Sequence, residues 1–95
     1  MAERIRQRMV FTGLVQGVGF RYLARHAAAA AGATGWVRNE PDGSVTMELQ
    51  GTREQIERVL EGVMRGRYVR GETLERTGIP LIDDERGFVT RAELW

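Results

Sequence analysis

The sequence predicts an α+β fold in which two helices pack on one face of a mixed sheet. Apolar and polar residues alternate over residues 45–50, which is typical of a strand with one buried face. Apolar residues recur at helical spacing over residues 20–31 and again over residues 56–63. Between these helices, the turn residues 40–44 (EPDGS) separate two strand-like runs. The helices are therefore expected to flank a hairpin.

The first third of the chain predicts a central strand followed by a helix. Residues 1–7 are polar and are expected to fray. Residues 8–15 carry apolar side chains on both faces of a strand, which favours a position inside the sheet. Residues 16–20 are expected as a loop, and residues 21–31 as a helix that ends at Gly32. The side chains expected to face the core here are Phe20, Leu23, Ala24, Ala27 and Ala31.

The middle of the chain predicts the hairpin. Residues 34–39 form its first strand, and the second strand begins at Val45 and ends at Gly51. In the second strand, alternation directs Val45, Met47 and Leu49 inward, and Thr46, Glu48 and Gln50 outward. The tight turn makes the two strands antiparallel.

The remaining chain predicts a second helix and two weaker strands. Thr52 and Gln55 have the spacing of a capping box, so they start the helix. Its buried stripe is expected to consist of Ile56, Val59, Leu60 and Val63. Residues 66–71 are expected as a loop, with strands near 72–79 and 87–92.

The element order is βαββαβ with a short extra strand. A helix joins the first two strands, so they are expected to be parallel, and the third strand can pair between them. This arrangement is a ferredoxin-like, split βαβ sandwich. We expect one domain over residues 1–95 with a core over about 8–92. Its first two strands end at residues 16–20 and 38–40, so these segments are expected at the same edge of the sheet.

Composition excludes several kinds of chemistry. The 95 residues contain no cysteine and no lysine, which removes thiolate nucleophiles, thiolate metal sites and Schiff-base chemistry. The net charge is +1 with both signs interspersed, so neither nucleic acid nor a membrane is an expected partner. The N-terminal residues are too charged for a signal peptide, and no run is apolar enough to span a bilayer. A cytoplasmic location is expected.

A glycine-rich loop between a strand and a helix is the strongest chemical signal. Gly17 and Gly19 let backbone N–H groups converge at a helix N-terminus, which can bind phosphate. Arg21 adds a guanidinium fork that matches phosphate oxygens in pairs. The pattern lacks the third glycine of a dinucleotide-binding loop and the lysine of a P-loop. On spacing alone, a tight turn without a ligand is equally compatible.

Each polar candidate also has a purely structural interpretation. Arg21 can be a solvated first-turn residue, and Asn39 can be a turn residue that bonds its own backbone. His26 is expected on the surface, residues 83–85 (DDE) as a solvated turn, and Trp36 in the core with Phe20. Arg65, Arg67 and Arg70 around Tyr68 are expected as a solvated loop.

Two segments resemble the acylphosphatase family. Residues 13–21 (GLVQGVGFR) are similar to its signature GxVQGVxFR at every specified position. Residues 35–39 (GWVRN), with residues 43–45 (GSV) and Gly51, resemble its second signature with the spacing kept. The resemblance implies a ferredoxin-like fold and metal-independent hydrolysis of acyl phosphates without a cofactor. It further implies that Arg21 binds the phosphate, that Asn39 holds the attacking water, and that backbone amides complete the phosphate site at Gln16, Gly17, Val18, Gly19, Phe20 and Arg21.

The missing residue types favour a direct mechanism. Without a cysteine or a well-placed histidine, a covalent phospho-enzyme has no evident nucleophile. The carboxylate leaving group of an acyl phosphate needs no general acid, so in-line attack by water is expected. The expected partners are a small-molecule acyl phosphate and inorganic phosphate as product and inhibitor, and the chain is expected to be a monomer. Two alternatives stay open: an anion-binding module without turnover, and an acylphosphatase-like part of a larger protein that uses carbamoyl phosphate.

Overall fold

The computed structural model describes residues 3–13, 19–64 and 73–91. Its elements are β1 (Arg4–Thr12), α1 (Phe20–Ala31), β2 (Thr34–Asn39), β3 (Val45–Thr52), α2 (Arg53–Met64), β4 (Thr73–Ile79) and β5 (Phe88–Thr90). The predicted element order is confirmed. The predicted bounds of the first strand are wrong at both ends, because β1 begins four residues earlier than expected and leaves the strand conformation at Gly13, whose φ is 104°. The expected loop over 66–71 lies outside the described residues.

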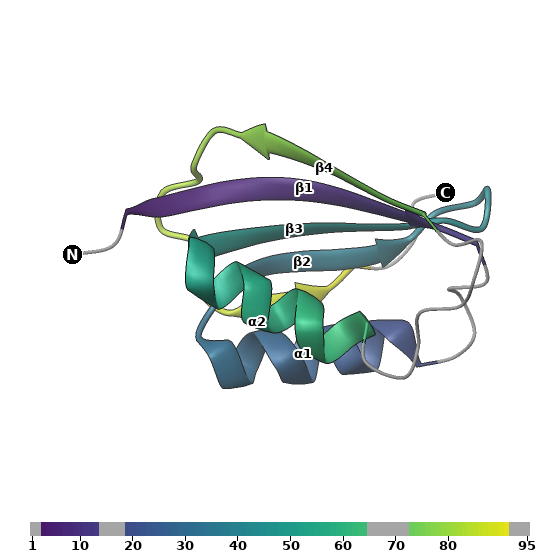
Figure 1. The fold of residues 1–95 in the computed structure, drawn as a ribbon, viewed down its shortest axis with the longest axis horizontal. Helices are drawn as coiled ribbons and strands as arrows, with labels where there is room; N and C mark the ends of the chain where they lie inside the picture. Colours follow the sequence, from purple (N-terminus) through teal and green to yellow (C-terminus); the bar gives the residue numbers. More distant parts are fainter. Residues whose placement is uncertain (1–2, 14–18, 65–72, 92–95) are drawn as a thin grey trace.

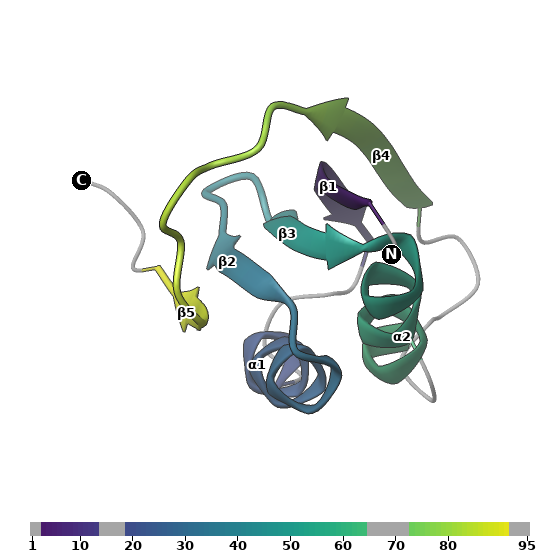
Figure 2. The same cartoon turned by 90° about the vertical axis from the view of Figure 1, so that its left-hand side faces the viewer.

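The five strands form one mixed sheet in the order β4-β1-β3-β2-β5. β3 lies in the middle and pairs antiparallel with β1 on one side and with β2 on the other. β1 and β2 are therefore parallel, as the helical connection requires. β5 extends the sheet by pairing parallel to β2. Both helices cover the same face (Figures 1 and 2), which confirms the ferredoxin-like arrangement.

The apolar core fills the space between the helices and the sheet. From α1 it receives Phe20 and two small alanines, Ala24 and Ala28, which let the helix lie close to the strands. From α2 it receives the predicted stripe of Ile56, Val59, Leu60 and Val63. The sheet contributes Met9, Phe11, Val37, Val45, Met47 and Leu49. Truncating one of these larger side chains costs about 2–5 kcal/mol in general.

The predicted helix termini are confirmed by their hydrogen bonds. The backbone N–H of Thr52 donates to Oε1 of Gln55 over 2.8 Å, and the N–H of Gln55 donates to Oγ1 of Thr52 over 3.1 Å. This reciprocal pair is a capping box. Gly32 ends α1 in the left-handed conformation, with its N–H on the carbonyl oxygen of Ala28. Local sequence signals thus determine where α1 ends and where α2 begins.

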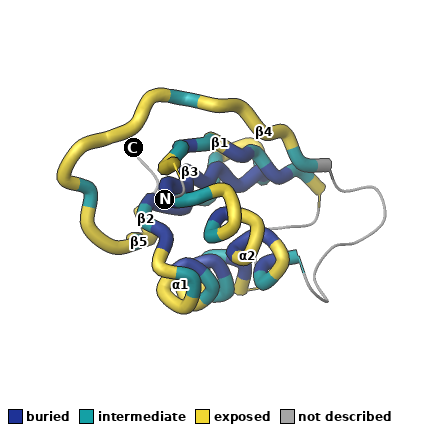
Figure 3. The backbone as a smooth tube through the Cα atoms, turned by 60° about the vertical axis from the view of Figure 1, so that its left-hand side comes forward, coloured by how far each residue is buried: buried dark blue, intermediate teal, exposed yellow. Residues whose placement is uncertain are grey.

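The face of the sheet opposite the helices is more buried than the alternation predicts. Thr46, Glu48 and Gln50 do point away from the helices, yet they are only 8%, 5% and 1% exposed. On this side of the sheet the chain between β4 and β5 passes from one edge to the other (Figure 3), where it contacts Gln50 and is itself mostly exposed. We call residues 80–87 the crossing segment. It connects one edge of the sheet with the other.

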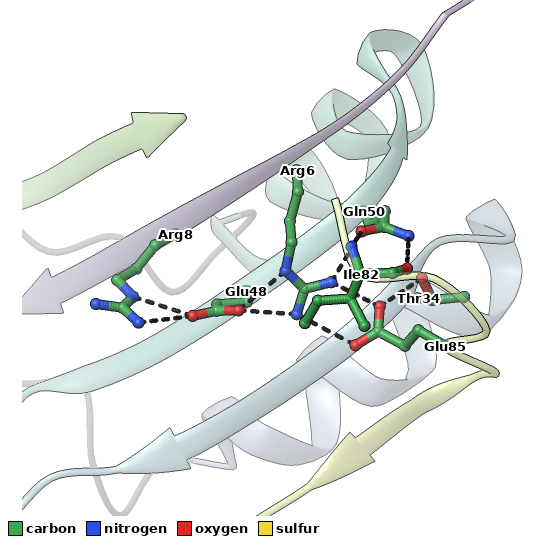
Figure 4. Close-up of polar contacts among 7 residues, drawn as sticks. All are labelled: Arg6, Arg8, Thr34, Glu48, Gln50, Ile82 and Glu85. Carbon is green, nitrogen blue, oxygen red and sulfur yellow. Dashed lines mark hydrogen bonds and ion pairs between the residues drawn. The ribbon is translucent and has the colours of Figure 1, made fainter. Parts of the chain in front are cut away.

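A buried guanidinium organises this second face. Arg6 is 2% exposed, and its guanidinium donates five hydrogen bonds, to Glu48, Gln50 and Glu85 (Figure 4). All of its N–H groups are therefore satisfied, which a buried charge requires. Residues 1–7 were expected to fray, and for Arg4 to Gln7 that expectation is wrong because Arg6 anchors the start of β1.

Side chains of the sheet also hold the crossing segment in place. The Gln50 amide donates to the carbonyl oxygen of Ile82 and accepts from its N–H, each over 2.9 Å, as a neighbouring strand would. Glu85 accepts a hydrogen bond of 2.7 Å from Arg6 and one of 2.8 Å from the hydroxyl of Thr34. The expectation that residues 83–85 form a solvated turn is therefore wrong for Glu85, which is partly buried and paired.

Glu48 lies between two arginines, and its ionisation depends on them. Burial would raise the pKa of this carboxyl, but hydrogen bonds from Arg6 and Arg8 outweigh burial and hold the pKa below its ordinary value of 4.5. Glu48 thus stabilises the folded state while it is charged. That contribution is complete above the ordinary pKa and is lost as the pH falls through the lowered one.

Replacing Glu48 by glutamine should be strongly destabilising at neutral pH. The Glu48→Gln variant leaves Arg6 with one carboxylate, and removing a partner of a buried ion pair costs about 3–5 kcal/mol. The difference from wild type in the free energy of unfolding should shrink as the pH falls through the lowered pKa of Glu48, where this carboxyl becomes protonated. Denaturant unfolding between pH 3 and pH 7 measures it. A difference that does not change with pH would contradict the role given to the Glu48 charge.

Gly35 allows the close approach of β2 and β3. Its φ is 143°, and a Cβ built on it would overlap the backbone carbonyl oxygen of Glu48. Since that atom belongs to the central strand, it cannot move aside without breaking the sheet. Gly78 in β4 offers a contrast, because a Cβ there meets no atom within 4 Å.

Gly35→Ala should therefore lower the free energy of unfolding by about 2–4 kcal/mol through overlap and backbone strain. The matched variant Gly78→Ala should change it by less than about 1 kcal/mol. Urea denaturation of both variants checks the pair. Equal effects of the two substitutions would refute the close-approach explanation.

Candidate active site

The N-terminus of α1 presents unpaired backbone donors. Gly19 occupies the N-cap position in the left-handed conformation, with φ 79° and ψ 20°, and no side chain of the described residues caps the helix. The N–H of Leu23 donates to the carbonyl oxygen of Gly19, so the three N–H groups before it have no partner within the helix. The first turn contains no acidic residue. This end of α1 therefore attracts anions.

Arg21 lies in that first turn and is partly buried. Its guanidinium makes no hydrogen bond or ion pair with any other residue that the structure describes. A cation at a helix N-terminus opposes the helix dipole at a cost of about 0.3–1 kcal/mol. A bound anion would remove that penalty.

Aromatic packing fixes the N-terminus of α1 at one end of the sheet. The rings of Phe11 and Phe20 meet edge to face with their centroids 4.7 Å apart. Phe11 is the last residue of β1 that pairs with β3, where its partner is Val45. The first turn of α1 is thus held at the end of the sheet where β1 leaves it.

Asn39 lies at the same end and on the same face. It is the last residue of β2, and its partner in β3 is again Val45, on the side opposite Phe11. Phe11 and Asn39 are therefore two strand spacings apart at the same level, a Cα separation of about 10 Å. Because Val37 points into the core, alternation directs Asn39 to the helix-bearing face as well.

The candidate residues that the structure describes lie at one edge of the sheet, the edge at which β1 and β2 end. Gly19, Phe20 and Arg21 begin α1, and Asn39 ends β2 at the same edge of the sheet. The other three predicted loop residues, Gln16, Gly17 and Val18, lie outside the described residues.

Asn39 is the last residue of a strand, and not a turn residue that bonds its own backbone. The carboxylate of Asp42 makes the turn bonds instead, accepting from the N–H and the hydroxyl of Ser44 over 2.9 and 2.6 Å. Both bonds lower the pKa of Asp42. Among residues with described positions, the side chain of Asn39 has no hydrogen-bond partner.

The other candidates have structural surroundings. His26 is exposed, as expected, and its ring lies 4.3 Å from that of Tyr22 on α1. Trp36 is buried as expected, but it lies on the face opposite the apolar core, beside Arg38 and Arg91. The basic residues between 65 and 70 lie outside the described residues.

Sequence reasoning missed an ion pair that flanks Asn39. Arg38 donates from Nε and Nη2 to one carboxylate oxygen of Glu40, over 3.1 and 3.0 Å. The signal was present, because opposite charges two residues apart share one face of a strand. Within the described ranges, no group of three or more His, Cys, Asp or Glu is placed to hold a metal ion. No helix in these ranges has the length and apolarity to cross a membrane.

Comparisons with known proteins identify the family of this chain. The family model described as Acylphosphatase matches residues 7–89. A relative named acylphosphatase from Salinibacter ruber is 44% identical over 81 residues, which cover 84% of this chain and 85% of the relative. The solved structure of an acylphosphatase from Coxiella burnetii matches with a TM-score of 0.76 and 26% identity, over 93% of each chain.

The same fold also occurs inside a longer protein. The crystal structure of T. kodakarensis HypF matches with a TM-score of 0.74 and 26% identity, over 94% of this chain but only 12% of that one. The family match and the identity to named relatives nevertheless decide the assignment. This chain belongs to the acylphosphatase family and is a hydrolase acting on acyl phosphates.

Proposed function

We propose that this acylphosphatase works by direct attack of water on the phosphorus atom. Arg21 and the backbone N–H groups of residues 16–21 hold the phosphoryl oxygens, and the side chain of Asn39 orients the water. No covalent intermediate forms, and neither a metal nor a cofactor takes part. The observation that carries the proposal is the pairing of both Phe11 and Asn39 with Val45, since it puts the two candidate segments at one edge.

The first turn of α1 supplies the charge stabilisation. A phosphoryl group in transfer spreads negative charge over three equatorial oxygens, and catalysis consists mainly of positioning and electrostatic stabilisation. Unpaired N–H groups at a helix start and a guanidinium fork are both suited to that charge. Because α1 is fixed through Phe20, the backbone N–H groups of its first turn are oriented before the substrate binds.

Asn39 supplies the geometry of attack. A carboxamide offers an acceptor oxygen and an N–H₂ donor, so it can hold a water molecule and fix its orientation. Its position on a strand that is paired at Val45 limits its movement. A chain without cysteine has no thiolate to form a phospho-enzyme. We propose that the phosphate of the substrate itself accepts the proton of the attacking water.

We further propose that inorganic phosphate, the product, competes with the substrate for the same donors. The enzyme is proposed to act in the cytoplasm, because a charged acyl phosphate does not cross a lipid bilayer unaided. It is proposed to act as a monomer. Glu75 and Arg76 on the exposed edge strand β4 support this, because charged edges resist pairing with a second sheet.

Two substitutions separate the roles of the site residues. Asn39→Ala should lower kcat about 10²- to 10³-fold, the usual loss for one preorganised group, while leaving phosphate inhibition unchanged. Arg21→Ala should lower kcat and also weaken phosphate inhibition, because it removes a direct phosphate contact. Steady-state hydrolysis of benzoyl phosphate, with phosphate as inhibitor, measures both. Wild-type turnover by Asn39→Ala would exclude the water-orienting role.

The substrate class and the metal independence have a separate test. With excess EDTA, the enzyme should hydrolyse benzoyl phosphate at its full rate and should leave p-nitrophenyl phosphate intact. The reason is that the poorer phenolate leaving group would need a general acid or a metal. Phosphate binding without any hydrolysis would instead indicate an anion-binding module. Loss of activity in EDTA that returns with added Mg²⁺ would refute metal independence.

A further inference from the structure

We propose that the Arg38–Glu40 ion pair positions the side chain of Asn39 for catalysis, an inference that rests on the proposed role of Asn39. The two charged residues flank Asn39 in sequence. Arg38 lies on the face of β2 that points away from the helices, and Glu40 follows directly after the end of β2. Both N–H groups of Arg38 converge on Oε2 of Glu40. Their side chains are only 24% and 22% exposed, so water screens the pair incompletely.

Trp36 provides a base for this ion pair. The guanidinium carbon of Arg38 lies 5.1 Å from the centroid of the Trp36 ring, which is 5% exposed. Residues 36, 38 and 40 thus form a row along one face, in which a buried ring contacts a cation and the cation contacts a carboxylate. An indole face attracts a guanidinium in this arrangement. The row restricts the rotamers of Arg38 and thereby those of Glu40.

The backbone of Asn39 is paired with a neighbouring strand on one side. On its inner side it pairs with Val45 of β3. On the outer side, β5 pairs with β2 only over Gly35–Val37, and the N–H of Arg91 then reaches the carbonyl oxygen of Val37. Among the described residues, no strand therefore pairs with Asn39 on that side. Within the described part of the chain, Asn39 thus lies at a strand end that is paired on one side.

The ion pair links the side chains of the two residues that flank Asn39, and the two peptide groups of Asn39 lie between them. Immediately after it, the N–H of Glu40 donates to the carbonyl oxygen of Ser44 over 2.8 Å, and the chain turns. Linking the side chains of residues 38 and 40 limits rotation of both peptide planes, and so fixes where the intervening side chain points. Misplacement of a catalytic group by about 1 Å can cost as much as 100-fold in rate.

The test compares Glu40→Gln in two backgrounds. In the otherwise wild-type enzyme, Glu40→Gln should lower kcat for benzoyl phosphate about tenfold, with the inhibition constant of phosphate unchanged. In the Asn39→Ala background the same substitution should have no further effect, because the group that it misaligns is absent. A purely structural ion pair would not produce this dependence on Asn39.

Two further variants serve as controls. Glu57→Gln breaks a comparable pair on α2, where Glu57 lies 2.6 Å from Arg76 of β4, and it should leave kcat unchanged. Arg38→Lys keeps the charge but loses the fork, so its kcat should fall between those of the wild type and Glu40→Gln. Circular dichroism at the assay temperature confirms that each variant is folded, and Arg38→Lys keeps the test valid if Glu40→Gln does not fold.

The outcomes separate this inference from the proposed function. If Asn39→Ala loses turnover while Glu40→Gln and Arg38→Lys match the wild type, the positioning role is wrong and the role of Asn39 stands. If Glu40→Gln still lowers kcat tenfold in the Asn39→Ala background, the inference is also wrong, because the ion pair then affects kcat through a group other than Asn39. Full turnover by Asn39→Ala would exclude the water-orienting role of Asn39, and with it the premise of this inference.

Discussion

The double pairing of Val45 is the constraint on which the rest of the site depends. Because β3 lies between β1 and β2, one residue of the central strand fixes the level of Phe11 on one side and of Asn39 on the other. The contact between the Phe11 and Phe20 rings then holds the first turn of α1 at the same end of the sheet. Backbone hydrogen bonds and one aromatic contact thus bring together segments that are 18 residues apart in the chain. No long-range contact between the polar side chains of the site is required for this placement.

Much of the fold was predictable because local signals and topology agree. The turn at 40–44, the capping box at Thr52 and the helical stripes are all short-range patterns, and each is present in the structure. The second face of the sheet was not predictable in the same way. Alternation shows that Glu48 points away from the helices, but only the tertiary structure shows that it is buried and held between Arg6 and Arg8. The partners of Arg6 are distant in sequence, and the polar, arginine-rich start of the chain, which predicts a frayed end, does not reveal them.

The candidate site was predictable to a different extent. The strand–glycine–helix order indicates an anion site from general chemistry, but Arg21 and Asn39 each had an equally simple structural interpretation. Resemblance to a family, not spacing, selected between those interpretations. The structure adds what a motif cannot contain, namely the face and level at which Asn39 lies. It also shows that Arg38 and Glu40, on either side of Asn39, form an ion pair. The sequence alone shows only that these two residues have opposite charges.

The span of the Arg6–Glu85 contact has a consequence for biosynthesis. These residues are 79 positions apart, and the chain leaves the ribosome from its N-terminus. When β1, β2 and β3 have just emerged, Arg6 can reach Glu48 and Gln50, but its second carboxylate, Glu85, has not yet left the ribosome. A nascent sheet at that stage must keep the guanidinium face hydrated, since burial would leave donors unsatisfied. Completion of the native sheet is thereby coupled to the emergence of the C-terminal part of the chain, after both segments of the candidate site have emerged.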